Sequence, residues 1–174
     1  LLKSITALEG ELPHHASYAG RPLQSYQRSL LRRRLRLLVP TPQLSTGTLL
    51  ENLTHFRSDQ LGPRAAQLCE QLAVAPWIQA LPRGYETPIG ETQDFPLSRS
   101  LRFRVQVIAA LLDEPAALFL DTSQVDLPAS ELQWFLGIQC EASKLVALEA
   151  WPPGLPASIP TLQWKASELV EVQP

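Results

Sequence analysis

The sequence has no methionine, only two cysteines, few aromatic residues and almost no net charge. Its 174 residues include 15 Lys and Arg against 17 Asp and Glu, which leaves a net charge of −2. This balance gives no electrostatic reason to expect nucleic acid as a partner, because nucleic acids bind proteins through an excess of positive charge. Cys69 and Cys140 lack the close spacing of a metal site. We expect both to be buried free thiols.

Long apolar runs are also missing. None approaches the roughly 20 residues that a membrane-spanning helix needs. The absence of methionine and the opening on Leu1 lead us to expect a piece of a longer protein. Hydrophobic residues make up 45% of the chain and charged residues 18%, as in ordinary globular domains. The length is sufficient for one domain with a sizeable core.

The most informative stretch of the chain is 97–127. Apolar residues in its first half recur at spacings of four, three and four positions, which predicts a helix with one apolar stripe: Leu101, Val105, Ile108 and Leu112. Pro115 ends this helix because proline has no amide hydrogen. The apolar run 116–120 predicts a strand buried on both faces, as in a parallel sheet. Asp121 follows at the strand end where open α/β sheets bind ligands, although a solvated aspartate with no ligand would give the same pattern.

The same stretch resembles the ATP-binding domain of ABC transporters, particularly those of the exporter or type I secretion type. In that family a Leu-Ser-Gly-Gly-Gln signature opens a helix, and a buried strand then leads to the Walker B aspartate and a catalytic glutamate. This chain keeps Leu97 and Ser98 but has Arg-Ser-Leu at 99–101 in place of Gly-Gly-Gln. Asp121 falls at the Walker B position, and Thr122 falls at the position of the catalytic glutamate.

Two further phrases carry the resemblance. Residues 46–53 are similar to the family's Ser-Gly-Thr-Ile-Arg-Glu-Asn-Ile segment, and 76–91 are similar to a long phrase typical of exporters. The resemblance implies that the end of the second phrase contacts the membrane domain, through Thr87, Gly90 and Glu91. A surface loop interrupted by proline and glycine is the alternative interpretation.

Other positions depart from the family pattern. Thr41 stands where the family has the glutamine of its Q-loop, and Gln43 lies two places later. Ala150 stands at the position of the switch histidine. The resemblance therefore assigns no catalytic residue and implies a nucleotide-binding set that consists of Asp121, Ser98, Thr41 and Gln43. Asp121 would also hold Mg²⁺ if nucleotide binds.

The fold that the resemblance implies is an α/β, P-loop NTPase-like fold with three layers. A mostly parallel central sheet would contain 35–39, 116–120 and 144–148, with antiparallel edge strands near both ends of the chain. A helical subdomain would span 50–112. Residues 1–174 would form a single ABC-type domain whose phosphate loop precedes Leu1.

The function that follows is a degenerate nucleotide-binding domain of an ABC exporter-like transporter. Such a domain binds ATP with Mg²⁺ weakly or not at all and does not hydrolyse it, because a threonine hydroxyl does not ionise near neutral pH. It would serve a structural or regulatory role at the cytoplasmic face of a membrane. Its partner would be a transmembrane domain or a second nucleotide-binding domain in a dimer.

Two alternatives remain open from the sequence. The chain is either the ATP-binding half of a heterodimeric transporter whose partner hydrolyses ATP, or a soluble scaffold that keeps the ABC fold for protein contacts. An intact phosphate loop upstream would favour the first alternative. A decayed phosphate loop without a membrane-spanning segment would favour the second.

Overall fold

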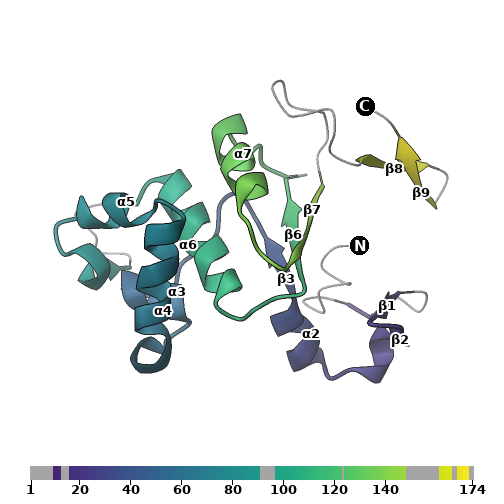
Figure 1. Ribbon diagram of the computed structural model, residues 1–174, viewed down its shortest axis with the longest axis horizontal. Helices are drawn as coiled ribbons and strands as arrows, with labels where there is room; N and C mark the ends of the chain where they lie inside the picture. Colours follow the sequence, from purple (N-terminus) through teal and green to yellow (C-terminus); the bar gives the residue numbers. More distant parts are fainter. Residues whose placement is uncertain are drawn as a thin grey trace.

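The computed structural model describes 10–12, 16–90, 97–122 and 124–147, together with the backbone of 161–165 and 168–172. The fold is mixed α/β, with a small parallel sheet beside a group of helices (Figure 1). The strand order in the sheet is β3 (Leu35–Leu38), β6 (Ala117–Asp121) and β7 (Ser143–Ala147). The three parallel strands predicted from the sequence are confirmed, with shifts of one residue at their ends.

The two faces of this sheet are covered by different parts of the chain. Because side chains alternate along a strand, Leu38, Leu118 and Leu120 all point to one face. There they pack against α6 (Arg99–Leu111) and α7 (Ala129–Gly137), whose Phe103 and Phe135 rings meet edge to face at 6.3 Å. The opposite face packs against the segment before the sheet, where Leu12, Leu23 and Leu31 meet Leu35, Ala117 and Phe119 of the sheet.

A second core lies among the helices on the other side of α6. It joins α6 to α3 (Leu49–Thr54), α4 (Ser58–Gln71) and α5 (Ala75–Gln79). The predicted apolar stripe of α6 faces these helices, whereas Phe103 and Val107 face the sheet. Helix α6 is therefore apolar on two sides and connects both cores. The boundaries 50–112 of a helical subdomain stay a prediction.

The remaining elements are short. Before the sheet come β1 (Ser17–Tyr18), β2 (Arg21–Pro22), a 3₁₀ turn (Leu23–Ser25) and α2 (Arg28–Arg34). Between α3 and α6 lie a second 3₁₀ turn (Gly84–Glu86) and β5 (Pro88–Ile89), which pairs with β4 (Gly47–Thr48). The last strands are β8 (Thr161–Lys165) and β9 (Glu168–Val172).

Two predictions about the fold need correction. The antiparallel strands near the chain ends form two-stranded sheets of their own, β1 with β2 and β8 with β9, rather than edges of the described central sheet. Within each pair the two strands are neighbours in sequence, so the hydrogen bonds between them are local. Cys69 is buried as expected, but Cys140 is exposed. Cys140 lies in the connection from α7 to β7, and connections run mainly over the surface.

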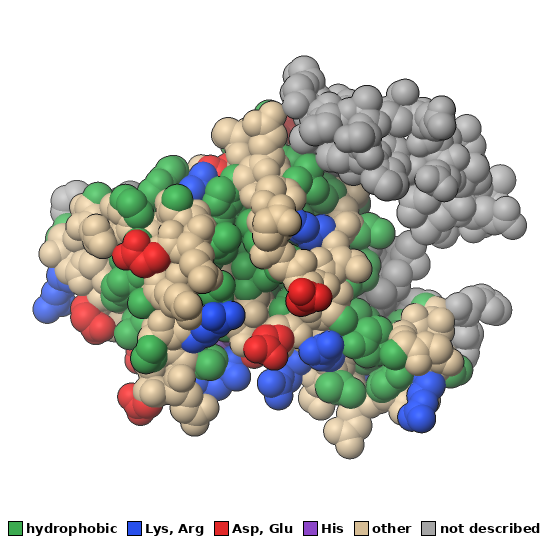
Figure 2. Space-filling model, in the orientation of Figure 1, with side chains coloured by type: hydrophobic (Ala, Val, Ile, Leu, Met, Phe, Trp, Pro, Cys, Tyr) green, Lys and Arg blue, Asp and Glu red, His purple; other side chains and the backbone are tan. Residues whose placement is uncertain are grey.

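The described helices include none long and apolar enough to cross a bilayer. Charged side chains are concentrated along the lower part of the face drawn in Figure 2, where arginines and acidic residues lie side by side.

Candidate functional site

The carboxyl ends of the parallel strands meet at one edge of the sheet. Asp121 is the last residue of β6 and lies opposite Ala147 of β7. At the same edge the chain leaves β3 and reaches Thr41 and Gln43, which are exposed and lie outside helices and strands. The structure thus brings Asp121 and the segment with Thr41 and Gln43, all predicted to bind nucleotide, to the same end of the sheet. Asp121 is half-buried there.

Thr122 is hydrogen-bonded to the backbone of the neighbouring strand. Its side chain and main chain are 6% exposed, and both its hydroxyl and its amide donate to the carbonyl of Ala147, at 2.7 and 3.2 Å. These bonds tie the ends of β6 and β7 together just beyond Asp121. The proton of the hydroxyl is committed to a carbonyl, and the position offers no carboxylate to a water molecule.

Ser98 caps α6. Its hydroxyl accepts a hydrogen bond from the amide of Leu101 at 3.2 Å, the ordinary role of a serine at a helix N-cap. The next residue, Arg99, donates from Nη2 to the carbonyl of Asp126. The start of α6 is therefore tied to the segment that follows Thr122.

The loop before α3 is held by a buried amide. Asn52 is 8% exposed. Its Oδ1 accepts from the Ser45 amide at 2.8 Å, and its Nδ2 donates to the carbonyls of Ser45 and Thr48, each at 2.9 Å. Thr48 and Glu51 complete a capping box, in which each side chain accepts from the backbone amide of the other. Residues 45–52 are thus fixed by bonds that span a few positions.

The predicted membrane-domain loop pairs with this same segment. The hydroxyl of Thr87 donates to the carbonyl of Gly84 at 2.7 Å, and the amide of Leu49 donates to the carbonyl of Thr87 at 2.9 Å. Thr87 is 5% exposed, so it supports the loop rather than presenting its side chain to a partner. Gly90 follows β5 and is half-buried, while Glu91 lies outside the described residues.

An exposed aromatic ring lies beside the β4–β5 ribbon. Phe56 is 54% exposed. Its ring is so close to Gly47 that a Cβ on that glycine would stand 3.1 Å from it, and 2.6 Å from the Glu51 carboxylate. Gly47 also has φ +147°, so a side chain there would be strained. Phe56 belongs to none of the predicted motifs, because its exposure cannot be read from the local sequence pattern.

A buried ion pair joins α6 to α7. Arg104 reaches Glu131 with two bonds, Nε to Oε2 and Nη2 to Oε1, both at 3.0 Å. Its guanidinium lies 4.5 Å from the Trp77 ring centre and 4.7 Å from that of Trp134. Glu131 is 3% exposed. This geometry combines a bidentate pair with cation–π stacking, and no local spacing predicts it.

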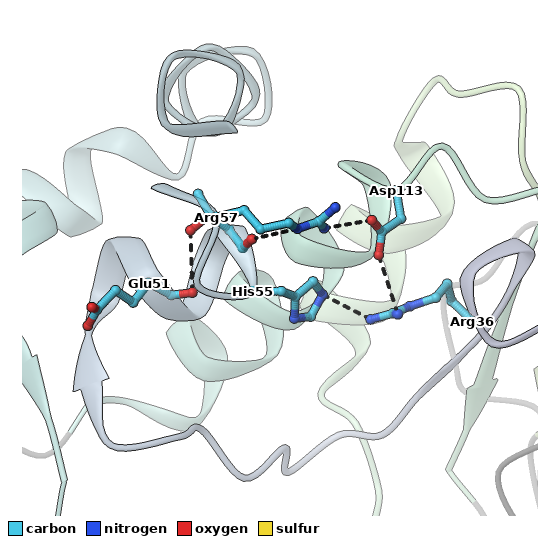
Figure 3. Close-up of polar contacts among 6 residues, drawn as sticks. Arg36, Glu51, His55, Arg57 and Asp113 are labelled. Atoms are coloured by element: carbon cyan, nitrogen blue, oxygen red, sulfur yellow. Dashed lines mark hydrogen bonds and ion pairs between the residues drawn. The ribbon is translucent and has the colours of Figure 1, made fainter. Parts of the chain in front are cut away.

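A second polar cluster lies where the turn after α3 meets the end of α6 and the strand β3 (Figure 3). The Asp113 carboxylate accepts from Arg57 at 2.7 Å and pairs with Arg36 at 3.5 Å. Arg36 also contacts His55 at 3.1 Å. Burial, together with the nearby Arg36, lowers the pKa of His55. Burial also lowers the pKa of Arg36, and Asp113 opposes that shift.

Three more groups have shifted pKa values. Burial raises the pKa of the Cys69 thiol to about 11, and a hydrogen bond with Tyr85 works against this rise. Burial also raises the pKa of Tyr85. Lys144 donates to the carbonyls of Phe135, Leu136 and Ile138 at the end of α7, and burial lowers its pKa. These groups stabilise helix ends and the core, away from the sheet edge.

Within the described part of the chain, no three His, Cys, Asp or Glu side chains gather as a metal site. A single carboxylate at Asp121 still suits Mg²⁺, which commonly binds one or two carboxylates and takes its other oxygens from phosphates and water. Ala150, predicted to stand at the switch-histidine position, lies outside the described residues.

Comparison with known proteins finds relatives among ABC transporters. A stretch of 117 residues, 62% of this chain, is 35% identical to "ABC-type transporter fsqE" of Aspergillus fumigatus, of which it covers 9%. A stretch of 118 residues, 63% of the chain, is 30% identical to "ABC multidrug transporter E" of the same fungus, again over 9% of that protein. "ABC transporter B family member 19" of Arabidopsis thaliana is 29% identical over 111 residues, 64% of this chain and 9% of that protein.

The chain is a distant relative of ABC transporters. The relation concerns their nucleotide-binding domains and covers part of the chain. The matched stretch spans less than a tenth of these relatives. No family model matches the chain. The resemblance predicted from the sequence is confirmed at this level.

Proposed function

We propose that this chain is the greater part of an ABC-type ATP-binding domain that does not hydrolyse ATP and that has a structural or regulatory role in a transport complex. The main observation is the identity and the hydrogen bonding of Thr122. It occupies the position of the family's catalytic glutamate, and its hydroxyl donates to the Ala147 carbonyl at 2.7 Å.

Loss of hydrolysis follows from the chemistry of phosphoryl transfer. The reaction depends on positioning, on compensation of charge and on a residue that orients the attacking water. General acid–base assistance alone contributes roughly 10² to 10⁴-fold. Thr122 supplies no carboxylate for this role, and Ala150 has no side-chain donor for the γ-phosphate.

Weak nucleotide binding remains compatible with the site. Asp121 would hold Mg²⁺ together with phosphate oxygens, and Thr41 and Gln43 lie in the exposed segment at the same sheet edge. Ser98 keeps its capping bond to Leu101. The bulk of Arg99 opposes the close backbone approach that glycine allows at this position.

The partner that fits this proposal is a transmembrane domain, which places the chain at the cytoplasmic face of a membrane. The face that would meet it is the β4–β5 ribbon with Gly90 and the exposed Phe56 ring; Glu91 belongs to the same prediction and lies outside the described residues. Thr87 would act by holding that ribbon to α3. A second nucleotide-binding domain would complete a dimer at the sheet edge and the start of α6. The P-loop, three-layer arrangement of the complete domain belongs to the same proposal.

Calorimetry and an ATPase assay test the proposal on the full-length protein, with ATP and Mg²⁺. We expect weak binding, no turnover above background, and loss of the Mg²⁺-dependent part of binding in Asp121→Asn. Asp126→Asn is the matched control, because that carboxylate is exposed on the same connection and should leave binding unchanged. Turnover that disappears in Thr122→Val would overturn the assignment. Absence of binding at millimolar ATP would favour the scaffold alternative.

A further inference from the structure

The turn between α3 and α4 has an unfavourable backbone. His55 has φ 50° and Phe56 has φ 60°, so two consecutive residues other than glycine adopt left-handed conformations. Such residues are uncommon, and each needs compensating contacts. The Phe56 amide bonds the Glu51 carbonyl at 2.8 Å, and the Arg57 amide bonds the Thr54 carbonyl at 3.2 Å. These bonds close the turn, and the His55 ring attaches it to the rest of the molecule.

The contact between Arg36 and His55 suits a neutral ring. Nη2 of Arg36 lies 3.1 Å from Nε2 of His55, which is exposed (Figure 3). A guanidinium carries only donors, so a hydrogen bond here requires Nε2 to accept, and the accepting imidazole is neutral. The hydrogen is then on the other ring nitrogen, where it suits the backbone hydrogen bond with Ala109 of α6. One neutral ring therefore bridges β3 and α6.

The charges around this ring are unbalanced. Arg36 faces it from β3 and Arg57 from the turn itself, whereas Asp113, at the end of α6, supplies the carboxylate. Both arginines already bind Asp113, whose side chain is 5% exposed. A cation at His55 would therefore be the third positive charge around a carboxylate that is already shared.

We infer that the turn 54–57 is an acid-sensitive joint: protonation of His55 turns the acceptor that faces Arg36 into a second donor and releases the turn from β3. Phe56 is carried by the same turn, so its exposed ring loses its fixed place beside Gly47 when the joint opens. The joint depends on these contacts alone and works whether or not nucleotide binds.

The direction of the pH effect follows from the lowered pKa of His55. Its ordinary value is 6.5. As the pH falls below this value, the unfolded chain takes up the proton before the folded chain does. The stabilisation by neutral His55 is therefore complete above pH 6.5 and is lost as the pH falls through the lower pKa of the folded state.

Histidine NMR titration and amide hydrogen exchange of the turn test this inference on the same full-length protein. His55→Gln keeps both an acceptor and a donor but cannot titrate in this range. His14→Gln with His15→Gln is the matched control, because it removes the other two histidines and leaves the joint. We expect the His55 resonance to titrate below pH 6.5. We also expect protection of 55–57 to fall at least several-fold between pH 7 and 5 in the wild type and in the control, relative to His55→Gln.

Two results would overturn the inference. One is titration of His55 at or above pH 6.5. The other is equal pH dependence of protection in the wild type and in His55→Gln. If His55→Gln fails to fold, the titration in the control variant still decides, since His55 is then the single histidine of these 174 residues.

Discussion

The β4–β5 ribbon and the carboxyl edge of the central sheet use their polar side chains in different ways. Around the ribbon, Asn52 bonds residues four and seven positions away, and Thr87 bonds Gly84 three positions away. At the sheet edge, Thr122 bonds Ala147, 25 positions away. The polar side chains around the ribbon therefore close local motifs, whereas the hydroxyl at the sheet edge joins two strands that are distant in sequence.

The largest loss of stability is expected where a contact joins segments that are distant in sequence and buried in the core. Removing one partner of the Arg104–Glu131 pair, in Arg104→Ala, should lower the free energy of unfolding by about 3–5 kcal/mol, because the buried Glu131 charge loses its partner. Urea denaturation measures the effect, with the exposed Arg102→Ala on the same helix as control. The double variant Arg104→Met with Glu131→Leu should recover part of the loss. Equal stability of Arg104→Ala and Arg102→Ala would show that the pair contributes little.

A local motif should show a smaller effect. Asn52→Ala leaves the backbone groups of Ser45 and Thr48 without their partner, at an expected cost of roughly 2–3 kcal/mol. Gln60→Ala, an exposed change on α4, should cost almost nothing. Thermal unfolding compares the two. A loss confined to local exchange protection of 45–48, with no change in unfolding, would mean that the ribbon loop opens independently of the core.

The smallest effect is expected at Thr122. Thr122→Val keeps the shape but removes the hydroxyl donor, so stability should fall by about 1 kcal/mol while the Thr122 amide still bonds Ala147. Thr122→Ser keeps the donor and is the control. Urea denaturation of both variants decides whether the hydroxyl serves the sheet. Unchanged stability in Thr122→Val would leave the hydroxyl free for another role.

Much of the fold was predictable because it depends on nearby residues. The spacing of Leu101, Val105 and Ile108 predicts the side of α6 that faces the helices, and the apolar run before Asp121 predicts the central strand. The candidate site was harder to predict from the sequence than the fold. The resemblance to the family singles out Thr122 and Ser98, but their partners Ala147 and Leu101 became known only when the strand ends and the helix start were located.

By itself, the sequence determined the apolar stripe of α6 and the parallel strands, and the capping box of Thr48 and Glu51 depends likewise on neighbouring residues alone. These features arise from periodicity and from hydrogen bonds over a few residues. Only the tertiary structure decided that Arg104 and Glu131 form a buried pair, that Asp113 is shared by two arginines, and that Cys140 is exposed. The physical reason is distance along the chain. Burial and charge pairing depend on which remote segments pack together, and no local pattern specifies that.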